Sequence, residues 1–243
     1  MRPLLVLMLV CIGMGLVPHY VHPPTHEITN MLICVIAARR DNASYVQRVV
    51  RALGSTPTVL IDLDDHYDVQ GPTRLVPSDR TREDCDPNEG DTGKPNCVTR
   101  QQTRDVALGL RRCSELADRN QWIVMLEDDM LACPHAVERM AQYLAGLNPD
   151  TTHAVKFAKF SRAVAFPPGG AVMAYARAIV EAAARLPYDL LIDGDWRHGT
   201  TTVYSGSLFS HIGAVSTNPY RNDPLFRQTW AYLRDESCGI RIM

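Results

Sequence analysis

The stretch Trp122-Ile-Val-Met-Leu-Glu-Asp-Asp129 decides the fold class, because an unbroken apolar run ends directly in three carboxylates. A short run of this kind is typical of a parallel strand that is buried on both faces of a sheet. In a mostly parallel sheet, ligands bind at the carboxyl ends of the strands. Three adjacent acids there repel one another unless a cation lies among them, and their hard oxygen ligands suit Mg²⁺ or Mn²⁺. The residues therefore predict a divalent-cation site at Glu127-Asp128-Asp129; the alternative is an acidic, solvated turn.

Further apolar runs and helical patterns before and after this strand predict that strands and helices alternate along the chain. Strands are predicted at Met31–Ala37, Thr58–Leu63 and His153–Phe157, and helices after a cap at Asp41 or Asn42 and over about 101–119, 135–147 and 171–186. The alternation predicts an α/β fold, a mostly parallel sheet flanked by helices, in a single domain. The polar stretch from Asp64 to about Val98 is too long for an ordinary connection and is predicted to be a functional loop or partly disordered.

The composition is that of a folded globular protein. The chain has 243 residues, of which 46% are hydrophobic and 21% charged, so it can bury one full-sized core. Its formal net charge of −2 gives no electrostatic reason to expect nucleic acid as a partner.

The N-terminus carries an unbroken apolar run, residues 4–17, behind the single basic residue Arg2. This pattern predicts a signal peptide or short signal-anchor over residues 1–22, followed by a linker over residues 23–30. The run is shorter than the roughly 20 residues that span a typical bilayer, so both cleavage and retention in the membrane stay open. A buried first helix is the alternative. We expect the protein in the lumen of the secretory pathway, either as a single-pass type II membrane protein of the Golgi or secreted.

The cysteines agree with a secretory route. Cys11 lies in the apolar run, and the remaining six form an even number, which suits disulfides. Cys85 and Cys97 bracket a stretch rich in Asp, Gly, Asn and Pro that a bridge would restrain. The spacings match no zinc pattern. Asn42-Ala43-Ser44 is an acceptor sequon for N-glycosylation.

A second acidic site competes with the triplet. Val59-Leu-Ile-Asp62-Leu63-Asp64 is a strand that ends in Asp-x-Asp, which is how phosphatases of the haloacid-dehalogenase type begin their active site. Those enzymes continue with a small flexible residue and a Thr or Val, whereas Asp65-His66-Tyr67 follows here. We therefore interpret this segment as an acidic turn that leads into the long loop.

Five blocks, taken in order, carry a resemblance to a known family. They are Arg100-Gln-Gln-Thr-Arg-Asp105, Trp122–Asp129, Phe160-Ser161, Pro187-Tyr-Asp-Leu-Leu-Ile-Asp193 and Ser207-Leu-Phe-Ser-His-Ile-Gly213. Their counterparts are a Lys-Gln-x-x-Asp helix, a strand ending in Leu-Glu-Asp-Asp, a Phe-Ser pair, a Pro-x-Asp-x-Leu-Leu-x-Asp block and a Ser-Leu-Phe-x-His-(Ile or Val)-Gly block. With these blocks the chain resembles the N-acetylglucosaminyltransferase IV family of N-glycan branching enzymes, over roughly residues 39–216. A related family, which adds N-acetylgalactosamine to glycosylphosphatidylinositol anchors, also carries an acidic triplet and a His-Ile-Gly block.

The resemblance implies a glycosyltransferase A-type fold for a catalytic domain over residues 31–243. It implies an inverting, metal-dependent enzyme that moves N-acetylglucosamine, or a related N-acetylhexosamine, from a UDP-sugar donor to a glycan acceptor, a mannose of an N-glycan. Mn²⁺ is the expected cation, and the membrane is a partner only through an uncleaved N-terminus. The alternatives are a transferase of N-acetylgalactosamine to the anchor glycan and a non-catalytic luminal protein of the same fold that binds glycans or a partner.

Roles for individual residues follow by position in the matched blocks. The donor and metal site is expected to contain Asp129 and His211 as metal ligands, and Glu127, Asp128, Arg100 and Gln101 as residues that bind the donor. Inversion needs a carboxylate to take the proton of the acceptor hydroxyl. Asp189 is the first candidate and Asp193 the second, since a spacing of four places both on one helical face; Asp195 is a third. The alternative is that Asp189 only caps a helix after Pro187.

Overall fold

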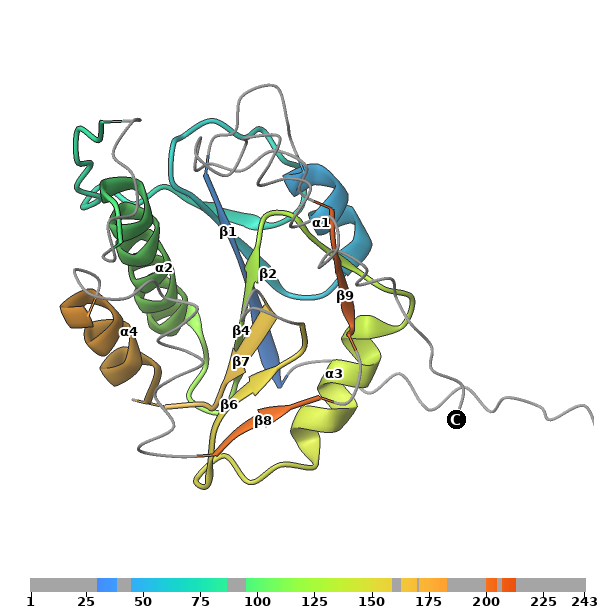
Figure 1. Ribbon diagram of the computed structural model, residues 1–243. Coiled ribbons are helices and arrows are strands. Elements are labelled where there is room, and N and C mark those ends of the chain that lie inside the picture. Colours follow the sequence, from blue (N-terminus) through green and yellow to red (C-terminus); the bar gives the residue numbers. More distant parts are fainter. Residues whose placement is uncertain are drawn as a thin grey trace, which may run out of the picture.

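The computed structural model of the protein describes residues 30–38, 45–86, 95–158, 163–169, 171–182, 200–204 and 207–212. Its centre is a seven-stranded sheet with the strand order β3-β2-β1-β4-β7-β6-β8 (Figure 1). The strands are β1 (Met31–Ala37), β2 (Thr58–Asp62), β3 (Thr73–Leu75), β4 (Trp122–Glu127), β6 (Thr152–Lys156), β7 (Ala163–Phe166) and β8 (Thr200–Val203). Only β7 runs antiparallel to its neighbours in this sheet. The predicted α/β class with a mostly parallel sheet is therefore confirmed.

Helices cover both faces of the sheet. The helices α1 (Val46–Leu53) and α3 (Ala136–Ala145) lie on one face, and α2 (Cys97–Leu116) and α4 (Ala171–Ala182) lie on the other (Figure 1). Two hydrophobic cores result, and the side chains of β1 alternate between them. Met31, Ile33 and Val35 belong to the first core, while Cys34 and Ile36 belong to the second. Because all seven residues of β1 are buried, the strand is apolar throughout.

Several boundaries differ from the sequence-based prediction, each for a local reason. The helix α2 begins at Cys97, before the predicted Gln101, because the side chain of Asn96 accepts a hydrogen bond of 2.8 Å from Thr99 N and caps it. The predicted cap of α1 at Asp41 or Asn42 is wrong, since the cap residue is Tyr45. His135 adopts a left-handed conformation (φ 61°), so α3 starts only after it.

The second, smaller sheet was not predicted. It pairs β5 (Met130–Ala132) with β9 (Phe209–His211) in antiparallel register, with Met130 opposite His211. Each strand has three residues, too few for a pattern of alternating side chains to stand out. The strand β7, inserted between β4 and β6, was missed as well.

Two disulfides join described residues. Cys34 of β1 is bonded to Cys113 of α2 across the second core, and Cys85 is bonded to Cys97 at the first residue of α2. The predicted Cys85–Cys97 bridge is thus confirmed, and the bridge fastens the long loop to the helix.

Some predictions lie outside the described residues. They concern the N-terminal segment 1–22 and most of the linker, the sequon at Asn42, the Phe160-Ser161 pair, and the acids Asp189, Asp193 and Asp195. Among the helices that the structure describes, none combines the length and the apolar character needed to cross a membrane.

Gly109 of α2 allows the helix to pack closely against β1. A Cβ atom at this position would lie 2.6 Å from Cδ1 of Ile36. Gly109→Ala removes a helix-weakening glycine but forces Ile36 to move, and we expect a net loss of about 1–2 kcal/mol in the free energy of unfolding, measured in urea. Ile36→Val in the same chain should recover part of it, because valine lacks that methyl group. A Gly109→Ala variant more stable than wild type would contradict this packing.

Candidate functional site

The acidic triplet lies at the carboxyl end of β4, in the middle of the sheet. Glu127 is the last residue of the strand, and the side chains of the next two acids are buried: Asp128 is 2% exposed and Asp129 is 1% exposed. Burial of carboxylates is costly unless hydrogen bonds or cations compensate it. The alternative of a solvated acidic turn is therefore wrong.

His211 reaches the triplet from the far end of the described chain. Its Nε2 lies 3.0 Å from Oδ2 of Asp129, although 82 positions separate the two residues. The pairing of β5 with β9 brings them together, and the backbone N–H of Ile212 donates a bond of 2.9 Å to the carbonyl of Asp129. The two residues predicted as metal ligands are thus neighbours.

This pair fits a divalent cation. A carboxylate oxygen and an imidazole nitrogen are both ligands of Mn²⁺. For metal–ligand bonds of about 2.1 Å, two adjacent ligands of an octahedral ion lie about 3.0 Å apart, close to the separation seen here. Among the described residues, one group of three His, Cys, Asp or Glu side chains lies close enough together to hold a metal, and it is Glu83 with Cys85 and Cys97, away from the Asp129–His211 pair. Its two sulfur atoms are joined in a disulfide, so they offer no thiolate.

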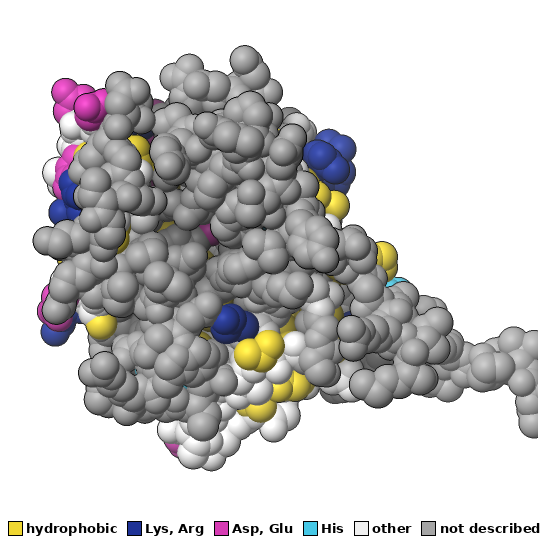
Figure 2. All heavy atoms as spheres, viewed as in Figure 1, with side chains coloured by type: hydrophobic (Ala, Val, Ile, Leu, Met, Phe, Trp, Pro, Cys, Tyr) yellow, Lys and Arg dark blue, Asp and Glu magenta, His cyan; other side chains and the backbone are white. Residues whose placement is uncertain are grey.

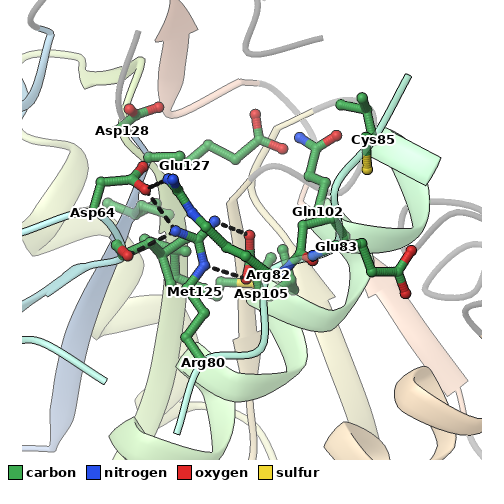
Figure 3. A pocket seen from close by; sticks show the side chains of 17 residues that line it. Asp64, Arg80, Arg82, Glu83, Cys85, Gln102, Asp105, Met125, Glu127 and Asp128 are labelled. Atoms are coloured by element: carbon green, nitrogen blue, oxygen red, sulfur yellow. Dashed lines mark hydrogen bonds and ion pairs between the residues drawn. The ribbon is translucent and has the colours of Figure 1, made fainter. Parts of the chain in front are cut away.

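A cavity of about 350 Å³ opens beside the triplet (Figure 3). Its walls come from the ends of β1, β2 and β4, from the first turns of α2 and from the segment 80–85. Glu127 and Asp128 line it, whereas Asp129 is not among the lining residues. The floor is apolar, with Ile36, Leu63, Val106 and Met125. The cavity thus combines an apolar floor with an acidic rim at the sheet edge where parallel sheets bind ligands.

Charged side chains are frequent in the described lining of the cavity. It contains the carboxylates of Asp64, Asp105, Glu127 and Asp128 and the guanidinium groups of Arg80 and Arg82. Arg80 pairs with Asp64 and Asp105, and Arg82 pairs with Asp64. The cavity therefore offers both acidic and basic groups to a ligand.

Arg80 ties the long loop to the cavity floor. Its Nε and Nη2 donate to the two oxygens of Asp105 on α2 at 2.9 and 2.6 Å, and its Nη1 donates to Asp64 at 2.6 Å and to the carbonyl of Leu63 at 2.7 Å. The side chains of this trio are nearly buried, at 10% exposure for Arg80, 6% for Asp64 and 7% for Asp105. Arg80 therefore holds the loop, β2 and α2 in one arrangement.

Of the two residues on α2 that the sequence predicts to bind the donor, one lines the cavity and the other does not. Gln101 lines the cavity, where its Nε2 donates to Asp105 at 2.9 Å and its Oε1 accepts from the backbone N–H of Glu83 at 3.1 Å. Arg100 is not among the lining residues; its Nη1 donates to the carbonyl of Pro95 at 2.9 Å. Of the pair, only Gln101 is placed to touch a ligand in this cavity.

No family model matches the sequence, and no curated protein does either. Solved structures of similar fold were found. Among them is a glycosyltransferase involved in the glycosylation of the major capsid of PBCV-1, with a TM-score of 0.48 and 9% sequence identity, and the match covers 79% of this chain and 97% of that chain. A likeness at this level carries no argument about activity, so the function has to be inferred from the residues of the site.

Asp62, the aspartate of the competing phosphatase interpretation, has a structural role. It is fully buried and accepts hydrogen bonds from the backbone N–H groups of His66 and Tyr67, at 3.1 and 2.9 Å, and from Nε of Arg74 at 2.9 Å. It does not line the cavity. These contacts close the turn after β2, which agrees with the interpretation of the segment as an acidic turn.

Sequence reasoning missed Asp64, Arg80 and Arg82 as residues of the cavity. The signal that could have found the arginines is the Cys85–Cys97 bridge, because it fastens the segment just after them to the start of α2. A loop that is fastened to the start of α2 forms one wall of the cavity together with that helix. The partners of Arg80, at spacings of 16 and 25 residues, leave no local pattern.

Proposed function

We propose that the protein is a metal-dependent, inverting glycosyltransferase that moves N-acetylglucosamine, or a related N-acetylhexosamine, from a UDP-sugar to a glycan acceptor, a mannose of an N-glycan. The observation that carries the proposal is the meeting of Asp129 and His211 at 3.0 Å beside a cavity rimmed by Glu127 and Asp128. The resemblance of the sequence blocks to N-glycan branching enzymes supplies the donor and acceptor classes.

In this proposal Asp129 and His211 hold the divalent cation, which supplies positive charge to the diphosphate of the donor. Glu127 and Asp128 face the ribose and the metal shell from the rim of the cavity. The apolar floor around Ile36 accepts the flat face of the base, and the amide of Gln101 offers polar contacts at its edge. The chain's own groups therefore orient the nucleotide at the end of β4.

The transfer itself needs a base on the acceptor side. A carboxylate takes the proton of the acceptor hydroxyl, the hydroxyl oxygen forms a bond to the anomeric carbon, and the bond from that carbon to the diphosphate breaks with inversion. We assign the base to Asp189 or Asp193 by the resemblance alone, because both lie outside the described residues. The two described disulfides support an oxidising compartment, in line with a Golgi or secreted location.

Ligand-linked stabilisation tests the donor and the cation together. A UDP-sugar at about 100 times its Kd, added with Mn²⁺, should raise the melting temperature by roughly 5–10 °C, and excess chelator should remove most of the rise. UDP-N-acetylglucosamine, UDP-N-acetylgalactosamine and GDP-mannose are compared by differential scanning fluorimetry. A rise of equal size in chelator, or a rise with GDP-mannose alone, would contradict the proposal. Transfer to a mannose-terminated N-glycan then separates an enzyme from a binding protein.

A further inference from the structure

Two guanidinium groups meet at one carboxylate oxygen in the wall of the cavity. Both Arg80 and Arg82 donate to Oδ1 of Asp64 (Figure 3). Their surroundings differ sharply, because the side chain of Arg80 is 10% exposed and that of Arg82 is 67% exposed. One arginine is thus part of the protein interior and the other faces solvent at the cavity.

Arg80 cannot leave its place without disrupting the wall. It is bound by both oxygens of Asp105 and by the carbonyl of Leu63, in addition to Asp64. Asp64 therefore keeps a buried guanidinium partner whether or not Arg82 stays. The separation of Arg82 from Asp64 leaves no buried carboxylate without a counter-charge, and exposed ion pairs of this kind contribute little stability.

We infer that Arg82 is an anion-binding side chain of the cavity, which exchanges its carboxylate partner Asp64 for a phosphate oxygen of the donor. The inference rests on the proposed function, which supplies the diphosphate. Arg82 lines the same cavity as Glu127 and Asp128, so a nucleotide that lies against those acids comes within the reach of a long, exposed arginine side chain. A guanidinium binds a phosphate through two parallel N–H bonds, a better match than one shared carboxylate oxygen.

The test compares Arg82→Ala and Arg82→Lys with Arg112→Ala. Arg112 is the control, because this arginine, whose side chain is 30% exposed, pairs with Asp79 and Glu115 and does not line the cavity. Acidic and basic side chains lie next to one another along the left edge of the molecule, on the side where α2 lies (Figure 2). The control removes the same charge from the surface. Circular dichroism melting checks that each variant folds.

Isothermal titration calorimetry in Mn²⁺ uses three probes: UDP, inorganic pyrophosphate and uridine. Arg82→Ala should weaken UDP and pyrophosphate by about 10- to 100-fold and leave uridine unchanged. Arg82→Lys should fall between it and wild type, because lysine keeps the charge and loses the planar fork. Arg112→Ala should match wild type with every probe.

The possible outcomes distinguish a failure of this inference from a failure of the proposed function on which it rests. Equal affinity of wild type and Arg82→Ala for UDP and pyrophosphate would overturn the role of Arg82 and leave the glycosyltransferase standing. An equal loss for uridine would overturn it too, since the arginine would then shape the cavity instead of binding an anion. Wild type that binds pyrophosphate through Arg82 but shows no preference for UDP would defeat the nucleotide donor and keep the anion site. A wild type that binds neither UDP nor pyrophosphate would overturn both the role of Arg82 and the proposed function.

Discussion

Asp129→Ala is expected to lower turnover of the UDP-sugar by about 100- to 1000-fold at saturating Mn²⁺, the loss typical of removing a charged group that stabilises the transition state. The reason is that Asp129 supplies the buried carboxylate of the proposed metal pair, and His211 alone offers one neutral ligand. Release of UDP from UDP-N-acetylglucosamine, with and without acceptor, measures the effect. Asp129→Asn, which keeps the shape and loses the charge, should fall almost as far.

Asp118→Ala is the matched control for this substitution. Asp118 is an exposed aspartate in the turn between α2 and β4, so its removal takes away the same charge at a distance from the cavity. Its turnover should equal that of wild type. His211→Ala should raise the Mn²⁺ concentration needed for half-maximal activity. Full activity of Asp129→Ala, or of wild type in excess chelator, would refute the metal site, and a wild type with no turnover on any glycan would favour the non-catalytic alternative.

Arg80→Ala is expected to lower the free energy of unfolding by about 3–5 kcal/mol, because the substitution removes the guanidinium shared by two nearly buried carboxylates. Urea denaturation followed by circular dichroism measures the change. Should the single variant fail to fold, Arg80→Met combined with Asp105→Asn provides the comparison, since it removes one buried charge of each sign and should retain more stability than Arg80→Ala.

Arg82→Ala serves as the control for stability as well. It removes an exposed arginine from the same oxygen of Asp64, and we expect a loss of about 0–1 kcal/mol. The contrast between two arginines on one carboxylate isolates the effect of burial from that of charge. Equal losses for Arg80→Ala and Arg82→Ala would show that the buried trio does not hold the wall.

The central strands could be predicted from the sequence because their pattern is local. The stretches Met31–Ala37 and Trp122–Leu126 are apolar throughout, and they pair in parallel in the middle of the sheet, buried on both faces. The three-residue strands β5 and β9 depend on each other, with Met130 opposite His211, so their pairing lies in no short window of sequence. The antiparallel strand β7 pairs with the nearby β6 and with the more distant β4.

The site divides in the same way. The acidic triplet and its position at the end of a strand could be predicted from a short stretch of sequence. The proximity of Asp129 and His211 was predicted from the matched blocks. Their role as metal ligands stays a prediction. The arginine wall of the cavity could not be predicted, because Arg80 and Arg82 come from a loop without periodic pattern. The assignment of the base to Asp189 or Asp193 also stays a prediction.

The bridge between Cys85 and Cys97 has a consequence for how such a protein can diversify. Because the two cysteines are covalently joined, the neighbouring Glu83 and Gln101 keep their positions whatever the length and composition of the chain between them. Lengthening a closed surface segment costs little free energy. Sequence change can therefore accumulate between the cysteines while the wall of the cavity that contains Glu83 and Gln101 keeps its arrangement.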